Sequence, residues 1–118
     1  MDETILLTIK KMLGLSSDDS SFDTDIIIHI NGTLTILYQL GVSNVEVVDS
    51  DTTWDSCFGE DIGFKALNAI KNYVYLKVRK GFDPPTSGTA MDSLDNLIKE
   101  YEWRINALVD PAFEVSIG

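Results

Sequence analysis

The residues with the clearest chemical potential are oxygen-bearing side chains spaced as in a calcium-binding loop. The segment DSDTTWDSCFGE, residues 49–60, carries them at loop positions 1, 3, 5, 7 and 12: Asp49, Asp51, Thr53, Asp55 and Glu60. This is the ligand pattern of an EF-hand. Trp54 stands where the sharp turn of such a loop needs glycine, and the preceding residues do not form an amphipathic helix. We therefore predict no metal site and no cofactor.

One histidine and one cysteine remain as candidates for catalysis. A nucleophilic site needs a base within reach of the nucleophile, and nothing in the spacing of His29 and Cys57 suggests that they meet. A lone histidine at the border of an apolar helix face is usually a packed residue, and we expect Cys57 to be a small buried or half-buried side chain. No phosphate-binding loop, dinucleotide fingerprint or Cys/His metal motif is present. We predict that the protein is not an enzyme.

The elements that would position these side chains are mostly helices. Apolar residues recur at helical spacing in four stretches: 3–13, 24–41, 61–80 and 88–109. A glycine is expected to end each of the first three: Gly14, Gly41 and Gly81. The prolines that follow the third and fourth stretches prevent either helix from continuing.

The stretch 24–41, TDIIIHINGTLTILYQLG, allows two structures. Its central Asn-Gly pair between alternating apolar residues is the strongest short-range signal for a β-hairpin. On a helix, however, the apolar side chains share one face: Ile26, Ile27, Ile30, Leu34, Leu37 and Tyr38. Asp23 or Thr24 is suited to cap such a helix. The periodicity favours the helix but leaves the hairpin open.

The third and fourth stretches have the widest apolar faces. In the third this face includes Phe64, Ala66, Leu67, Ile70, Tyr73, Val74, Tyr75 and Val78, which predicts a central helix packed on more than one side. In the fourth it includes Met91, Leu94, Leu97, Ile98, Tyr101, Ile105 and Leu108. Asp95–Lys99 and Glu100–Arg104 are expected to form i, i+4 ion pairs on this helix.

These patterns predict an all-α fold, a small bundle of about four helices. Residues 42–60 are expected to form an irregular loop with a brief extended piece at 45–48. We expect residues 1–110 to form one helical domain and residues 111–118 to form an extended C-terminal tail, a candidate partner-binding arm. No apolar run approaches the ~20 residues of a membrane span.

The charge of the chain is strongly negative and unevenly placed. A formal net charge of −10 argues against general affinity for DNA or anionic membranes. Five of the nine basic residues nevertheless lie between positions 65 and 80, with no acidic residue among them: Lys65, Lys71, Lys77, Arg79 and Lys80. This basic run is either a helix end with favourable charges or a patch that faces an acidic partner.

Several apolar residues interrupt polar faces and are candidates for protein interfaces. Trp103 is predicted to lie opposite the apolar stripe of the fourth helix, and Ile28 interrupts the polar side of the second. Tryptophan is enriched at binding hot spots. Alternatively, Trp103 covers the loop 42–60 of its own chain. The tail alternates apolar and polar residues, as a strand added to a partner does. The complete set of interface candidates is Trp103, Ile28, Lys77, Arg79, Lys80, Phe113, Val115 and Ile117.

Three segments of the sequence resemble one family of proteins: FDTDIIIHINGTLTILYQLGV, KNYVYLKVRKGFDPPTSGTAMDSL and IKEYEWRINALVD. That family is the head–tail connector (adaptor) proteins of tailed bacteriophages. The resemblance covers about residues 3–110, and its most specific pieces are FDPPTS (82–87) and EWRIN (102–106). It implies a helical bundle, with a helix rather than a hairpin at 24–41.

The resemblance implies a structural virion protein of the phage neck. Its copies would form a ring, typically of twelve, that docks on the portal, extends the DNA channel and provides the platform for the stopper or tail. The implied partners are the portal protein, a stopper or tail-completion protein and further copies of the chain. Genomic DNA would pass without specific binding, and no membrane is involved. The implied location is the head–tail interface of the virion, with assembly in the host cytoplasm.

Two other functions compete with this one. A small acidic binding module could inhibit a host nucleic-acid enzyme by imitating the charge of DNA, which requires carboxylates arrayed along one surface. Here the acidic residues are scattered over loops and helix ends, and the basic run interrupts them. An enzyme that uses Cys57 or His29 ranks last.

Overall fold

The computed structural model describes residues 3–42, 49–59 and 62–109, and across these residues the fold is all-α. Its helices are α1 (Ile5–Leu13), α2 (Asp23–Gln39), α3 (Trp54–Phe58), α4 (Phe64–Phe82) and α5 (Gly88–Val109). The predicted small helical bundle is confirmed, with one helix more than expected.

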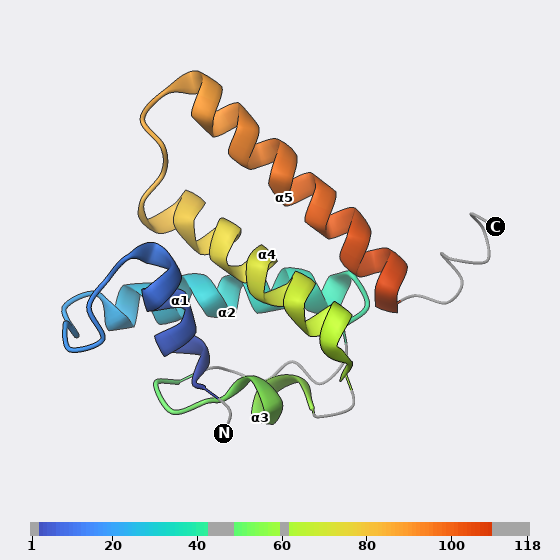
Figure 1. Cartoon of the computed structure of the whole chain (residues 1–118), viewed down its shortest axis with the longest axis horizontal. Coiled ribbons are helices and arrows are strands. Elements are labelled where there is room, and N and C mark those ends of the chain that lie inside the picture. Colours follow the sequence, from blue (N-terminus) through green and yellow to red (C-terminus); the bar gives the residue numbers. More distant parts are fainter. Residues whose placement is uncertain (1–2, 43–48, 60–61, 110–118) are drawn as a thin grey trace.

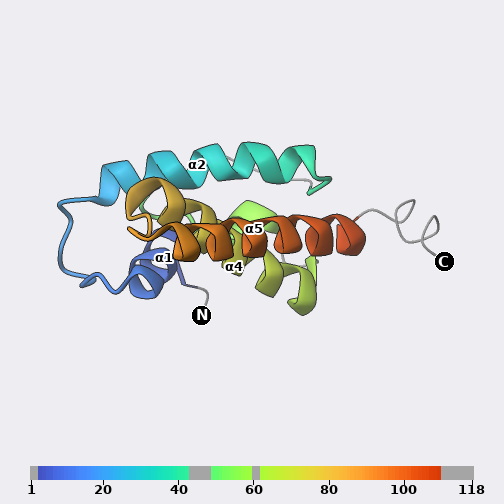
Figure 2. The same ribbon diagram turned by 90° about the horizontal axis from the view of Figure 1, so that it is seen from above.

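The centre of the bundle is α4, which packs against α5, α2 and α1. Figure 1 shows α4 crossing the middle of the molecule, with α5 on one side and α1 and α3 on the other. Seen from above, α2 runs along a further side (Figure 2). The side chains of Ile70, Tyr73, Val74 and Val78 are completely buried. A wide apolar face therefore did indicate a helix that is packed on several sides.

Apolar packing and one polar contact join α4 to α5. The hydroxyl of Tyr73 donates a hydrogen bond of 2.7 Å to Oε2 of Glu102. The pKa of Tyr73 is raised well above its ordinary value. Burial is the larger cause, and the hydrogen bond to a carboxylate is the second. The buried residues of α5 are Leu94, Ile98 and Ile105. Leu97 and Leu108, predicted to belong to this face, are exposed instead, because α5 packs mainly against α4.

Two local predictions about these helices are wrong. Gly81 does not close α4, because the helix continues through it to Phe82 and ends before the two prolines that follow Asp83. Asp95 does not pair with Lys99 on its own helix. Its carboxylate lies 2.6 Å from the ammonium of Lys80, which α4 brings opposite it. The second predicted pair, Glu100–Arg104, is present at 2.6 Å.

The stretch that allowed a hairpin is a continuous helix. α2 runs straight through Asn31 and Gly32, and its buried residues are Ile26, Ile30, Thr33, Leu34 and Leu37. The hydroxyl of Thr33 donates to the carbonyl of His29 at 2.9 Å, which satisfies a polar group within the helix. Gly41 has a φ of +111°, as expected for the residue after a helix. Burial of one helical face has overridden the local turn signal.

The start of α2 differs from the prediction. Its N-cap residue is Phe22, which makes no side-chain capping bond, so neither Asp23 nor Thr24 caps the helix. Asp23 pairs instead with Lys10 of α1, with 2.9 Å between the carboxylate and the ammonium. The ammonium of Lys10 also donates to the carbonyls of Asp19 and Ser17, at 2.6 and 3.3 Å. This buried cation ties the connector between α1 and α2 to the bundle.

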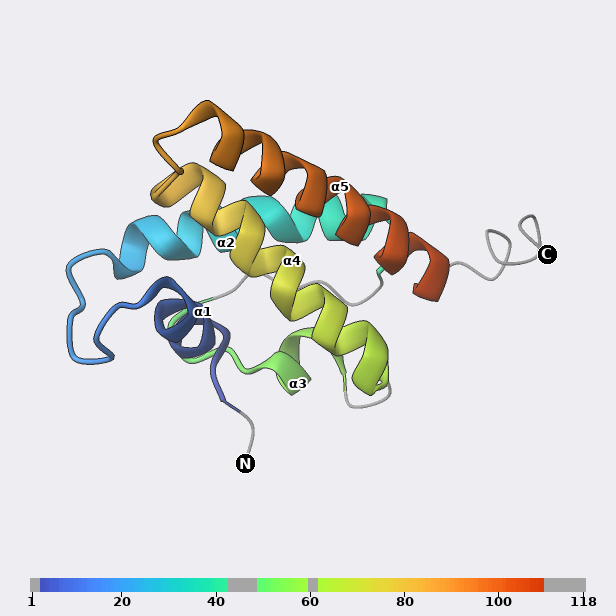
Figure 3. The same ribbon diagram turned by 45° about the horizontal axis from the view of Figure 1, so that its top comes forward.

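The predicted irregular loop contains α3. Thr53 caps this short helix: its hydroxyl accepts from the backbone N–H of Ser56 at 3.1 Å, and the hydroxyl of Ser56 accepts from the N–H of Thr53 at 3.0 Å. The N–H of Ile5 donates to the carbonyl of Thr52 at 2.9 Å, which joins the starts of α1 and α3 (Figure 3). Five helical residues are too few to show a period. The predicted extended piece at 45–48 lies outside the described residues.

Candidate protein-binding surfaces

The described side chains of the calcium-like segment include several that form hydrogen bonds to nearby residues of the same segment. The carboxylate of Asp49 accepts hydrogen bonds of 2.9 Å from the N–H of Asp51 and from the hydroxyl of Thr52. These bonds lower the pKa of Asp49 below its ordinary value. Thr53 caps α3, and Glu60 lies outside the described residues. In the part of the chain that the structure describes, no three His, Cys, Asp or Glu residues gather as metal ligands.

The two candidates for catalysis occupy different environments. Cys57 is completely buried in α3, as the sequence predicted. His29 lies on α2 in a surface hollow that Cys57 does not line. The structure therefore does not bring this thiol and this imidazole together in one site.

A first surface hollow, the α4–α5 hollow, surrounds Trp103. Its volume is about 420 Å³, and its lining consists of Phe64, Lys65, Asn68, Ala69, Tyr101, Trp103, Arg104, Ala107 and Leu108. Trp103 is 57% exposed, and the side chains of Phe64 and Leu108 beside it are exposed as well. All of these residues come from α4 and α5. The described residues thus place Trp103 at an apolar surface of the two longest helices rather than over the segment 49–59.

A second surface hollow, the α2–α4 hollow, brings together three of the predicted interface residues. Its volume is about 490 Å³, and it is lined by Ile28, His29, Gly32, Thr33, Ile36, Lys77, Lys80 and Gly81. Ile28 is 62% exposed at its edge. Lys77 and Lys80 add positive charge, although Lys80 is already paired with Asp95. An exposed isoleucine next to two cations could receive an acidic surface with an apolar residue.

The basic run of α4 does not form one patch. The ammonium of Lys71 lies 5.3 Å from the ring centre of Trp54. Arg79, predicted at the interface, donates to the hydroxyl of Tyr75 at 3.2 Å, and this bond raises the pKa of its guanidinium. Lys65 lines the α4–α5 hollow and Lys77 the α2–α4 hollow. The remaining interface candidates, Phe113, Val115 and Ile117, lie outside the described residues.

Besides Leu97, sequence reasoning missed three exposed apolar residues: Phe64, Tyr38 and Leu108. Phe64 and Tyr38 were assigned to core faces but are 84% and 68% exposed. Phe64 is the first residue of α4, and Leu108 lies in the last turn of α5. Residues in the terminal turns of a helix can extend past the neighbour that buries its middle. This position was the available signal for all three, because Tyr38 lies in the last turn of α2.

The close approach of α2 and α4 yields a testable consequence at Gly81. A Cβ at Gly81 would lie 2.6 Å from two ring atoms of His29. We expect Gly81→Ala to destabilise the protein by about 1 kcal/mol, because the overlap outweighs the gain in helix propensity. In a His29→Ala background the overlap is gone, and the same substitution should stabilise. Urea unfolding of the parent, the two single variants and the double variant measures the change in free energy of unfolding in each background.

Gly32 supplies a matched control for this experiment. It is also a helical glycine, but nothing lies within 4 Å of an added Cβ there. Gly32→Ala should therefore stabilise by up to about 1 kcal/mol in either background. An equal effect of Gly81→Ala with and without the His29 ring would contradict the proposed overlap.

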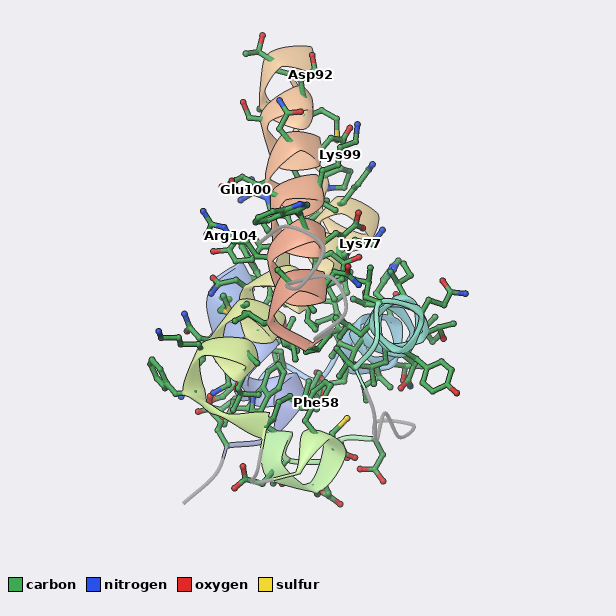
Figure 4. All side chains as sticks on the ribbon, turned by 90° about the vertical axis from the view of Figure 1, so that its right-hand side faces the viewer. Phe58, Lys77, Asp92, Lys99, Glu100 and Arg104 are labelled. Carbon is green, nitrogen blue, oxygen red and sulfur yellow. The ribbon has the colours of Figure 1, made fainter. Side chains whose placement is uncertain are left out.

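The two hollows differ in how much exposed apolar surface they contain. Phe64, Trp103 and Leu108 gather in the α4–α5 hollow, and such a patch marks an interaction surface more often than an isolated residue does. In the α2–α4 hollow the exposed apolar residue is Ile28. Figure 4 shows Arg104, from the first hollow, and Lys77, from the second, on opposite flanks of α5. Among the described helices, none combines the length and the apolar composition that crossing a bilayer requires.

Comparison with known proteins identifies the family. The family model of phage connector proteins matches residues 5–112, and the chain belongs to this family. No curated protein and no solved structure matches the chain. Phage connectors are structural proteins of the phage neck, so the chain is a structural component of a phage virion. The resemblance in the sequence is confirmed at the level of the family.

Proposed function

We propose that the chain is the ring-forming subunit of the phage neck that docks on the portal. In this proposal a ring, typically of twelve copies, extends the DNA channel and provides the platform for a stopper or tail-completion protein. The observation that carries the proposal is the family match across residues 5–112. The subunit acts without catalysis or cofactor, at the head–tail interface, after assembly in the host cytoplasm.

The positions of the two hollows support a ring. A closed cyclic ring joins each copy to the next through two different surfaces of the same subunit. The α4–α5 hollow and the α2–α4 hollow differ in lining, and their residues Arg104 and Lys77 lie on opposite flanks of α5. A subunit with one apolar hollow and one that combines an exposed isoleucine with two lysines suits contact with a different surface of the neighbour on each side.

The charges support a channel through which DNA passes without being held. The formal net charge is −10. Several of the few cations are engaged within the chain: Lys10 pairs with Asp23, Lys80 with Asp95, and Lys71 lies over Trp54. Phosphate binding requires cations that can displace the counterions of DNA. A wall built from this chain would offer few of them.

The direct test is binding to purified portal, or to tailless capsids, of the source phage. Bound copies per portal are counted by quantitative mass spectrometry, and about a dozen copies are expected per portal vertex. No binding, under conditions in which other neck proteins attach, would refute the proposal. Inhibition of a host nucleic-acid enzyme would then become the function to test.

Within this experiment we expect Trp103→Ala to weaken assembly on the portal by about tenfold or more, as for a hot-spot tryptophan. Leu97→Ala is the matched control, because Leu97 is another exposed apolar residue of α5 but lines neither hollow. Both variants should keep a melting temperature close to that of the parent. A drop as large as that of a core truncation would show that Trp103 acts inside the subunit.

A further inference from the structure

We propose that residues 111–118 of one copy bind in the α4–α5 hollow of the next copy, an inference that rests on the proposed ring. The hollow presents an apolar surface made by Phe64, Trp103 and Leu108. Its volume of about 420 Å³ is in the range of pockets that bind ligands. An apolar occupant would bury this surface favourably.

The tail has the side chains that this occupant needs. In the sequence PAFEVSIG, apolar Phe113, Val115 and Ile117 alternate with Glu114 and Ser116. An extended chain places alternate side chains on opposite faces, ~7 Å apart along each face. Three apolar side chains can then enter a hollow while the two polar ones remain outside. This is how an extended peptide is recognised through alternate side chains.

The charges of the two surfaces are complementary. Residues 110–118 contain two acidic residues, Asp110 and Glu114, and no basic residue. The hollow contributes Lys65 and Arg104. Arg104 already pairs with Glu100, but both side chains are half-exposed, and a guanidinium has five N–H donors for further carboxylates. Opposite charges at the rim favour the association of tail and hollow.

The last turn of α5 packs against the end of α2 on a face other than the one that lines the hollow. Val109, the last helical residue, packs against Gly41 at the end of α2, where an added Cβ would lie 3.3 Å from it. Asn106 faces the same way and donates to the carbonyl of Leu40 at 2.8 Å. The hollow instead faces the first turns of α4. Because Pro111 favours an extended Asp110, we expect the tail to lead away from α5 rather than fold back along it.

Site-directed disulfide formation tests the inference. One batch of the full chain carries Ala107→Cys, in the hollow, and a second batch carries Val115→Cys, in the tail. The two are mixed on the portal and oxidised, and the products are separated without reductant. Cys57 is completely buried and gives little background. Since each chain has one engineered cysteine, a disulfide between these positions joins different copies. We expect about tenfold more of it than with a control cysteine, because docking raises the local concentration of the thiols.

The control replaces Ala107→Cys with Asp92→Cys, which lies at the far end of the same helix (Figure 4). Equal yields from the two positions on portal-bound copies would overturn the inference while leaving the proposed function intact. A further variant carries both Ala107→Cys and Val115→Cys in one chain. If it forms only the disulfide within that chain, the tail occupies its own hollow. If no copy binds the portal, the proposed function fails. The mixture is then oxidised at high concentration in solution without portal. The yields of the disulfide from Ala107→Cys and from Asp92→Cys are again compared, and they test the contact between tail and hollow independently of the portal.

Discussion

Replacing Trp54 with alanine is expected to lower the free energy of unfolding by about 3–5 kcal/mol, the usual cost of truncating a buried aromatic side chain. Trp54 has no exposed surface and stacks on Phe58, with 6.0 Å between the ring centres. Its Nε1–H donates to the hydroxyl of Thr8 at 2.9 Å, and Lys71 lies over its ring. One side chain thus holds α3 against both α1 and α4. The loss is a large part of the 5–15 kcal/mol that stabilises a typical domain.

Urea unfolding followed by circular dichroism measures this effect. Trp54→Phe is the conservative comparison: it keeps most of the apolar contact and loses the hydrogen bond to Thr8, so we expect a smaller loss. Trp103→Ala is the comparison at the surface and should change stability little, because 57% of that side chain is already exposed. Similar losses for the two alanine variants would show that α3 is not anchored through Trp54.

The second large effect is expected at Lys10. Replacing it with methionine should cost about 2–4 kcal/mol, because the partners of a buried cation are left unpaired. Lys10 is 3% exposed. Its ammonium binds the carboxylate of Asp23 together with the backbone carbonyls of Ser17 and Asp19. Methionine keeps the length and the apolar character of the stem, so the loss measures the charge and its bonds.

The adjacent lysine makes a matched control. Lys11 pairs with Glu3 at 2.5 Å but is largely exposed, so Lys11→Met should change stability by less than about 1 kcal/mol. Adding Asp23→Ala to Lys10→Met should recover part of the loss, since the second substitution removes the unpaired carboxylate. Thermal unfolding of these variants gives the comparison. Equal losses of stability at positions 10 and 11 would mean that the segment between α1 and α2 is not held by the buried cation.

The long helices could be predicted because each has enough residues to show a period. α5 begins and ends where apolar spacing and proline placed it, and α2 is a helix although it contains an Asn-Gly pair. α3 could not be found in this way, because its stability comes from contacts that Trp54 makes with α1 and α4. The ion pair of Asp95 illustrates the same limit. Spacing suggested Lys99, whereas packing supplied Lys80 from another helix.

The candidate surfaces were only partly predictable. An apolar residue on a polar face identified Trp103 and Ile28, and both are exposed in hollows. Phe64 was assigned to the core by its period, but its position in the first turn of α4 exposes it. Lys10 follows Leu6 by four residues on an apolar face, which was a signal for a buried lysine. Its backbone partners lie in the segment between α1 and α2. The path of that segment past α1 is not specified by any periodicity in the sequence.

The contrast between the two tryptophans has a practical consequence for following assembly by intrinsic fluorescence. The chain contains two indoles, one with no exposed surface and one that is 57% exposed. Emission from a buried indole changes when the protein unfolds, whereas a soluble quencher reaches an exposed indole until a partner covers it. The emission spectrum of the unlabelled protein therefore reports folding through Trp54. Its quenching by iodide reports occupation of the α4–α5 hollow through Trp103.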